Sequence, residues 1–299
     1  MTMTTSTTTS PADSSAAMRK VPTRRVSFEE ALQDIPKHFA ADGDLLHSHL
    51  TACLSALFPD GEDFFVRSVR HYRDQITDPE LKQAVAGFIG QEAVHGREHR
   101  VLNDRLDELG YPTKRIERLT KRGLALRAKL APPSSNLATT AALEHFTATL
   151  AELLLTDPGT RDLFGDDNVR NLFLWHALEE SEHKAVAFDV YQAVGGTERM
   201  RVLSMNMITV GFLVTLAGQM LVSVLGDRET YRRGTLRKSW KGFRRSPFLT
   251  KDFRHQLRDY NRPGFHPDDR DTASLIDTWR TELFGDAGSL NDLLPRAAA

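Results

Sequence analysis

The sequence predicts an all-α protein built on a four-helix bundle with additional C-terminal helices. Helical periodicity recurs along most of the 299 residues. No region alternates apolar and polar residues between tight turn signals, as a half-buried strand would. Two Glu-x-x-His motifs, Glu92/His95 and Glu180/His183, fall in the middle of two predicted helices. These observations together predict helices that carry carboxylates and imidazoles into the core of a bundle.

The first half of the bundle is predicted from two segments joined by a short link. The first covers about residues 45–76 and is expected to break near Pro59, with Asp60 as the N-cap of the part that follows. The second covers about residues 79–109, between a proline in its first turn and the stop signal of Gly110. The short link makes these two helices antiparallel neighbours.

The second half of the bundle follows the same plan. One helix is predicted over about residues 136–155, and another from about Asp167 to the Gly195-Gly196 stop. A basic stretch, residues 113–130, is also predicted to be helical and lies in the long link between the two halves. Two hairpins joined by one long crossover form the ferritin-like arrangement.

Three regions are expected along the chain. Residues 1–25 are rich in Ser and Thr and carry no apolar run, which predicts a disordered tail. A transit peptide is the alternative for this segment. Residues 26–260 are expected to form the metal-binding helical bundle, and residues 261–299 a C-terminal extension.

The composition of the chain excludes several classes of function. The formal net charge of −1 argues against a nucleic-acid partner. Cys53 is the only cysteine, which excludes an internal disulfide, a multi-cysteine zinc site and an iron–sulfur cluster. Any metal must therefore be held by imidazoles and carboxylates. A reducing, cytoplasmic location fits this cysteine usage.

The two Glu-x-x-His motifs are the strongest functional signal. Residues three or four apart share one face of a helix, so each motif can offer a carboxylate and an imidazole to one ion. Di-metal carboxylate bundles combine two such motifs with one Glu from each of two further helices. Glu144 lies in an apolar run of the third helix, and His176 lies one turn before Glu180. The predicted metal ligands are Glu62, Glu92, His95, Glu144, His176, Glu180 and His183.

Some of these residues have a second interpretation. Glu62 would occupy the first turn after the predicted break, where the helix dipole favours an acid without any metal. His176 could be a core histidine bonded to a carbonyl group.

Neighbouring titratable residues are expected to play lesser parts. His99 would either orient a ligand or lie on the surface, and Glu152 shares the helix face of Glu144. His145 points about 100 degrees away from Glu144 around the helix and is left out of the site. Three further acids are predicted on solvated faces: Glu98, Glu179 and Glu182.

The phrases FPDGEDFF, FIGQEAVHGREH, LEHFTATLAE and WHALEESEHKAVAFDVY resemble a bacterial family of predicted metal-dependent hydrolases. The similarity covers about Phe58 to Gly196 and implies the same seven ligands. The ligand pattern alone also resembles the di-iron p-aminobenzoate N-oxygenases, which have an extra histidine where this chain has His176. That second resemblance lies in the ligands, not in the overall sequence, so it implies no substrate.

Residues 202–226 carry no charge, and a basic stretch follows them. The segment is long enough to span a bilayer. Because it is only moderately hydrophobic, we expect a buried or dimer-forming helix rather than membrane insertion. The further options are a homodimer interface, a wall of an apolar substrate channel, or attachment of residues 202–245 to a membrane surface.

The sequence thus predicts a non-haem di-metal enzyme. Two metal ions are expected, with iron first and manganese or zinc as alternatives. The expected reaction is oxidation of a small, apolar organic substrate with O2, which requires an electron donor. The alternatives are hydrolysis by a metal-dependent hydrolase and ferritin-like metal binding without catalysis.

Overall fold

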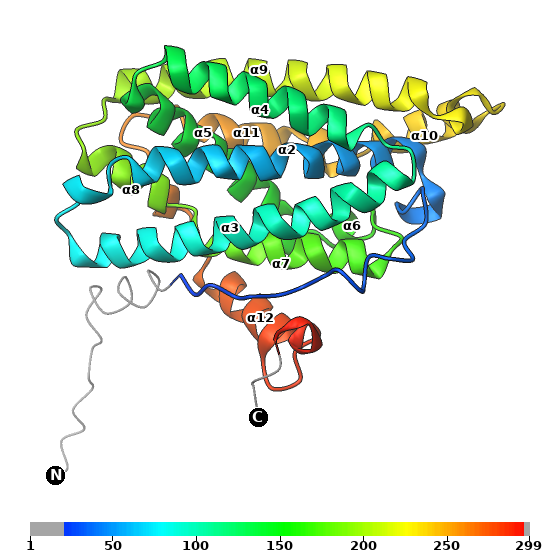
Figure 1. Ribbon diagram of the computed structural model, residues 1–299, viewed down its shortest axis with the longest axis horizontal. Helices are drawn as coiled ribbons and strands as arrows, with labels where there is room; N and C mark the ends of the chain where they lie inside the picture. The colour runs from blue at the N-terminus through cyan, green and yellow to red at the C-terminus, as the bar shows by residue number, and fades with distance from the viewer. Residues whose placement is uncertain (1–20, 296–299) are drawn as a thin grey trace, which may run out of the picture.

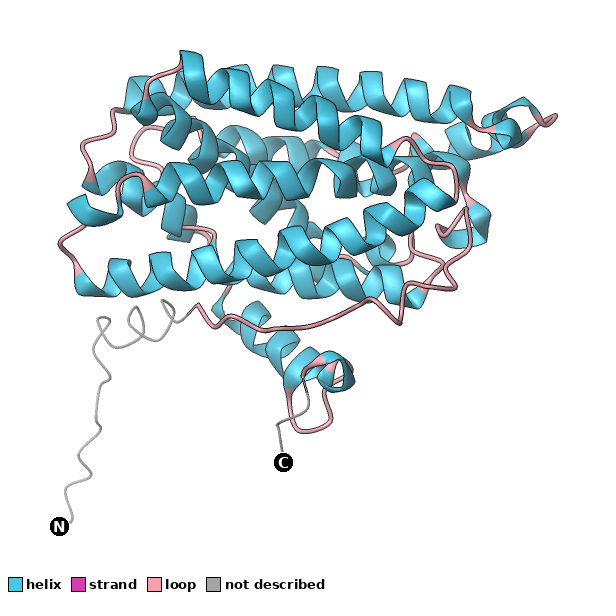
Figure 2. Cartoon of the chain, viewed as in Figure 1, coloured by secondary structure: helices cyan, strands magenta, loops and turns pink. Residues whose placement is uncertain are grey.

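The computed structural model describes residues 21–295, and apart from one isolated β-bridge the regular secondary structure in this range is helical (Figure 2). No strand occurs among these residues; the one β-bridge joins Ala40 to Phe164. The α-helices are α2 (Leu45–Arg70), α3 (Pro79–Glu108), α4 (Thr113–Leu130), α5 (Pro133–Thr156), α6 (Pro158–Arg161), α7 (Asp167–His183), α8 (Val186–Ala193), α9 (Glu198–Gly226), α10 (Thr235–Phe243), α11 (Lys251–Asp259) and α12 (Ala273–Phe284). Short 3-10 turns are η1 (Ala41–Gly43), η2 (Arg73–Gln75), η3 (Arg228–Tyr231), η4 (Pro247–Leu249), η5 (Pro267–Asp269) and η6 (Asn291–Leu293). The all-α prediction is confirmed.

Four of these helices form the predicted bundle. α2 packs against α3, and α5 packs against α7, so that each pair is an antiparallel hairpin. α4 lies in the connection between the two hairpins and returns along α2 (Figure 1). Its bounds are those predicted from the sequence. Local signals set the helix starts: the Asp78 carboxylate accepts a hydrogen bond from Glu80 N at the start of α3, and Asp166 caps α7 in the same way.

The predicted break near Pro59 is wrong, because α2 runs through this residue without interruption. A proline inside a helix leaves the carbonyl group four residues earlier without its usual donor. Here that carbonyl belongs to Ser55, and the Asn103 side chain of α3 donates a hydrogen bond to it at 3.2 Å. Asp60 is therefore a mid-helix residue and not an N-cap. The partner that lets the helix continue lies 48 residues further along the chain.

A second difference concerns the fourth predicted helix, which is two helices. α7 ends at His183, Lys184 and Ala185 form a turn, and α8 begins at Val186. Neither proline nor glycine marks this turn in the sequence, so no local signal could have located it.

The chain before α2 is ordered from Val21 onwards, earlier than the expected end of the tail at residue 25; residues 1–20 lie outside the described part. This N-terminal segment, residues 21–39, runs in an extended path beneath α3 and α7 (Figure 1). Val26 and Phe28 are fully buried in it. α12 covers α7 beside it, and Trp279 Nε1 donates to Leu155 O at 3.0 Å. Part of the C-terminal extension is thus joined to the bundle core.

α9 lies outside the four bundle helices, along α5 and α2 (Figure 1). Its composition and length would allow it to cross a membrane, yet only 11% of its most apolar window is buried. The expectation of a helix buried in this chain is therefore wrong. One stripe packs on the bundle, including Met205 and Phe212, and the opposite stripe is exposed.

Candidate metal centre

All seven predicted ligands meet at the centre of the bundle. α2 supplies Glu62, α3 supplies Glu92 and His95, and α5 supplies Glu144. The remaining three come from α7: His176, Glu180 and His183. Each of the seven is at most 4% exposed. Glu62 lies in the middle of α2, so the helix-dipole interpretation of this residue is wrong.

Their donor atoms form overlapping groups, within each of which the atoms lie no more than 4.8 Å apart. These groups are Glu62–His95–His176, Glu92–His95–Glu180 and Glu92–Glu144–His183. Glu92 and His95 each belong to two of them, so the groups join into one continuous cluster. Four carboxylates and three imidazoles in one cluster match the donor set of a di-metal carboxylate site.

Many of these donor atoms have no hydrogen-bond partner among the described residues. The atoms without a hydrogen bond are both carboxylate oxygens of Glu62, Glu92 and Glu144, Oε2 of Glu180, Nδ1 of His95 and Nε2 of His183. His183 Nε2 does lie close to two of these oxygens, 3.1 Å from Glu92 Oε1 and 3.5 Å from Glu144 Oε2, so these contacts stay within the cluster. A buried carboxylate without a partner costs several kcal/mol, so folded proteins rarely keep one. A cation would satisfy all of these atoms at once. The residues present therefore fit a metal pair.

The acid–base properties of the cluster agree with this interpretation. Burial, together with the neighbouring Glu92 carboxylate, raises the pKa of Glu62 and of Glu144 well above the ordinary range. Burial alone would also raise the pKa of Glu180, but the His183 and His176 rings hold it well below its ordinary value. Ionising Glu62 and Glu144 therefore requires positive charge beyond that of the cluster's own imidazoles.

In each ligand imidazole, one nitrogen faces the carboxylates of the cluster. The other nitrogen contacts a side chain that is not itself a predicted ligand. His95 Nε2–H donates to Glu179 Oε2 at 3.0 Å, and His183 Nδ1–H donates to Gln91 Oε1 at 2.8 Å. His176 Nδ1 lies 2.6 Å from His99 Nε2. Such outer contacts fix the tautomer and the orientation of a metal-binding imidazole. Within residues 21–295, His176 makes no hydrogen bond to a carbonyl group, so its core-histidine interpretation is not supported.

Beyond His99, the hydrogen bonds continue to the surface of the bundle. His99 Nδ1 lies 2.9 Å from Ser55 Oγ, which donates to Asn103 Oδ1. Asn103 Nδ2 in turn donates to Glu117 Oε1 of α4. His99 is fully buried, so the surface alternative for this residue is wrong. Gln91 was missed, although it stands directly before Glu92 in the sequence.

The three acids predicted on solvated faces are all buried, so that prediction is wrong. Glu179 is 0% exposed and Glu182 is 7% exposed. The Arg24 guanidinium, from the N-terminal segment, donates to both at 2.8–2.9 Å. Glu98 accepts a hydrogen bond from Phe28 N at 2.7 Å. The N-terminal segment covers the faces of α3 and α7 that periodicity alone assigns to solvent.

Two further residues of the sequence analysis lie away from the cluster. Glu152 forms an ion pair with Arg270 near the surface. His145 is buried in a separate site, where its Nε2–H donates to Gln256 O at 3.0 Å. The exclusion of His145 from the ligands agrees with this position. Glu152 makes its ion pair away from the cluster and does not hold a metal ligand in place.

Aromatic rings enclose the cluster. The Trp175 ring lies 4.9 Å from that of His95, and the Phe88 ring lies 5.0 Å from that of His183. Phe58 contacts His176 edge-on at 4.8 Å. The large groove of the structure, about 460 Å³, lies elsewhere, between α4 and α9. The cluster is therefore closed to bulk water, which strengthens electrostatic interactions inside it.

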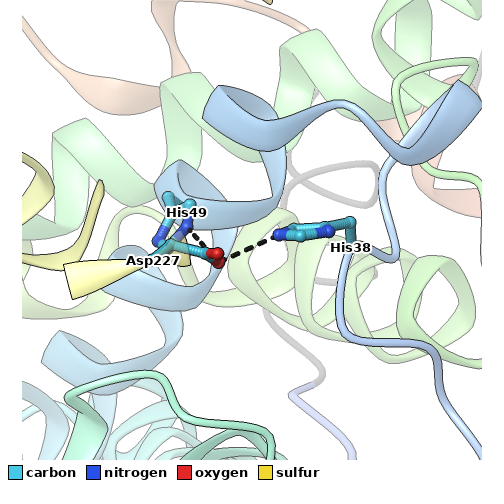
Figure 3. Close-up of side chains that lie close together, drawn as sticks. All are labelled: His38, His49 and Asp227. Atoms are coloured by element: carbon cyan, nitrogen blue, oxygen red, sulfur yellow. Dashed lines mark hydrogen bonds and ion pairs between the residues drawn. The ribbon is translucent and has the colours of Figure 1, made fainter. Parts of the chain in front are cut away.

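A second histidine–carboxylate group joins distant parts of the chain (Figure 3). Asp227 Oδ2, just after α9, accepts from His38 Nε2 at 3.0 Å and from His49 Nε2 at 3.2 Å. The Lys37 ammonium lies 3.1 Å from the same oxygen, and Ser223 Oγ lies 2.7 Å from His49 Nδ1. Every one of these contacts satisfies a donor, and the ammonium already supplies the positive charge. We therefore assign this group as a buried ion-pair network and not as a metal site.

This network predicts a measurable pH dependence. Burial lowers the pKa of His49 to about 4, although Asp227 favours its charged form. Between pH 6.5 and 4 the unfolded chain binds a proton that the folded chain does not, so stability falls as the pH is lowered. The wild type is expected to lose about 1–2 kcal/mol more than His49→Gln between pH 7 and pH 5. Urea unfolding at both pH values checks this; equal losses would show that folding does not lower the pKa of His49.

The fold and the cluster together define a helical metal-binding protein with a buried carboxylate–histidine centre. The chain belongs to the family of predicted metal-dependent hydrolases, whose model matches residues 22–271. No curated protein and no solved structure matches the chain. Metal dependence therefore rests on two independent findings, the family and the buried donor groups.

Proposed function

We propose that the chain is a non-haem di-metal enzyme, with iron as the resident metal, that uses O2 to oxidise a small organic substrate. The observation that carries this proposal is the set of buried donor atoms without partners, formed only by carboxylates and imidazoles. Glu62, His95 and His176 would hold one ion, and Glu92, Glu144 and His183 the other. Such ligands suit iron or manganese. Such a redox-active pair would supply electrons for the activation of O2.

The chain's own residues would prepare the site for this chemistry. Glu179, Gln91 and His99 hold the three ligand imidazoles in one orientation. The rings of Phe58, Phe88 and Trp175 exclude water, which limits side reactions of oxidising species. An oxygenase of this kind also requires an electron donor, and we include one among the proposed partners.

Hydrolysis is the second candidate, because the family description favours it. A metal pair can lower the pKa of water and polarise a carbonyl or phosphoryl group. Within the described part of the chain, no serine, threonine, cysteine or lysine side chain hydrogen-bonds to a ligand side chain. Among these described residues the site thus offers no separate nucleophile of these four types, and this supports placing hydrolysis second.

Metal analysis followed by oxygen exposure tests the proposal. The purified protein is loaded with ferrous iron without air, its bound iron is counted, and O2 is added under a spectrophotometer. Two iron ions per chain and a transient visible band would support the oxidase. Tightly held zinc with no response to O2, together with turnover of a chromogenic ester or phosphoester, would replace it with the hydrolase. Uptake of many ions per chain would instead indicate storage.

A further inference from the structure

The exposed stripe of α9 forms part of a large apolar face on one side of the molecule. α9 has 29 residues and is about 43 Å long. α4 lies beside it, and both helices line the groove of about 460 Å³. The exposed apolar residues of α9 and α4 are Leu203, Met207, Val210, Leu213, Val214, Leu221, Val222 and Leu225, with Leu119, Leu126 and Leu130. Soluble monomers rarely expose so long an apolar surface without using it.

The helix α4 and the segment that follows α9 are rich in basic residues. Residues 113–130 contain seven basic and one acidic residue, residues 228–245 contain eight basic and one acidic, and residues 202–226 contain none of either. These segments together hold thirteen more basic than acidic residues, in a chain whose net charge is −1. Exposed Leu236 and Trp240 of α10 add apolar side chains among the basic ones. An apolar surface bordered by cations is complementary to an anionic lipid surface.

We propose that α4, α9 and α10 attach the protein to the surface of an anionic membrane. α9 would lie flat and would not span the bilayer, because its inner stripe packs on the bundle: the Phe212 ring lies 5.5 Å from that of Phe146, and Met205 is 1% exposed. A second copy of the chain fits less well, because two strongly basic faces would meet. This proposal is independent of the metal chemistry.

Vesicle binding by the full-length protein tests the proposal. The protein is floated with vesicles of phosphatidylcholine alone and with vesicles of equal parts phosphatidylcholine and phosphatidylglycerol. We expect binding to the anionic vesicles only, weakened by high salt. Reversing two exposed charges, Arg237→Glu with Lys238→Glu, should weaken binding by at least about tenfold. The matched control reverses exposed Arg73 and Lys82, which lie away from this face.

A second variant tests the apolar contribution. Val210→Gln, Val214→Gln and Leu221→Gln change side chains that are 60–67% exposed, so folding and metal content should remain unchanged. Binding to anionic vesicles should again fall at least about tenfold. Absence of vesicle binding by the wild type would overturn the proposal. A concentration-dependent dimer that this variant abolishes, seen by analytical ultracentrifugation, would assign the face to a second copy and also overturn it.

Discussion

Replacing Glu144 with methionine is expected to lower metal affinity by more than about 100-fold and at the same time to stabilise the metal-free protein. The Glu144 side chain is 1% exposed, and neither of its oxygens has a hydrogen-bond partner among the described residues. Burial and the Glu92 carboxylate raise its pKa well above the ordinary range, so a metal-free protein must bury an unsatisfied acid. A methionine side chain has a similar length and has no polar oxygens that need a partner when buried. The gain should be about 1–3 kcal/mol in urea unfolding with a chelator present.

Glu152→Met provides the matched control on the same helix. Glu152 lies eight residues after Glu144 and pairs with Arg270 near the surface. Its replacement should leave metal content unchanged and cost at most about 1 kcal/mol. Two results together would make Glu144 an ordinary core residue. The purified Glu144→Met variant would bind metal as the wild type does, and with a chelator present it would be less stable than the wild type. A variant that gains stability and loses metal binding cannot be explained by a core role, because a residue with a purely structural role does not normally destabilise its own fold.

Local sequence signals were sufficient to locate α3 and to place the ligands along each of the four bundle helices. Asp78 with Pro79 and the stop at Gly110 delimit α3, and the spacing within each helix determined which ligand side chains share a face. Glu144 could be recognised because it is an acid inside an apolar run. These features depend on neighbours within a few residues, and such neighbours can be read from one sequence.

The features that were predicted wrongly depend on distant partners. α2 continues through Pro59 because Asn103 on another helix satisfies a carbonyl group. Glu179 and Glu182 look like surface acids until Arg24, more than 150 residues earlier, is placed against them. α9 has the composition of a buried helix, but the bundle covers only one of its stripes. The periodicity of a single helix contains no information about contacts with such distant residues.

Arg24→Ala should therefore have a large effect, although sequence reasoning placed this residue in a tail. The guanidinium is the cation closest to Glu179, and it also pairs with Glu182. Burial raises the pKa of Glu179 to about 8 even though Arg24 opposes that shift. Removing Arg24 takes hydrogen-bond donors away from two buried carboxyl groups, and breaking a buried pair in this way costs about 3–5 kcal/mol. Urea unfolding should show this loss, and metal affinity should fall about 10- to 100-fold because Glu179 positions His95.

Two further variants separate this electrostatic effect from simple loss of packing. Arg25→Ala changes the exposed neighbouring arginine and should alter neither stability nor metal affinity. Adding Glu179→Gln to Arg24→Ala removes the carboxyl group that has lost its cation and keeps an oxygen that accepts from His95, so most of the lost stability should return. Arg280 still pairs with Glu182 in that double variant, at 2.9 Å, so no second charge is left alone. If the double variant were as unstable as Arg24→Ala, the arginine would act through its packing on Phe284, which it contacts at 4.9 Å.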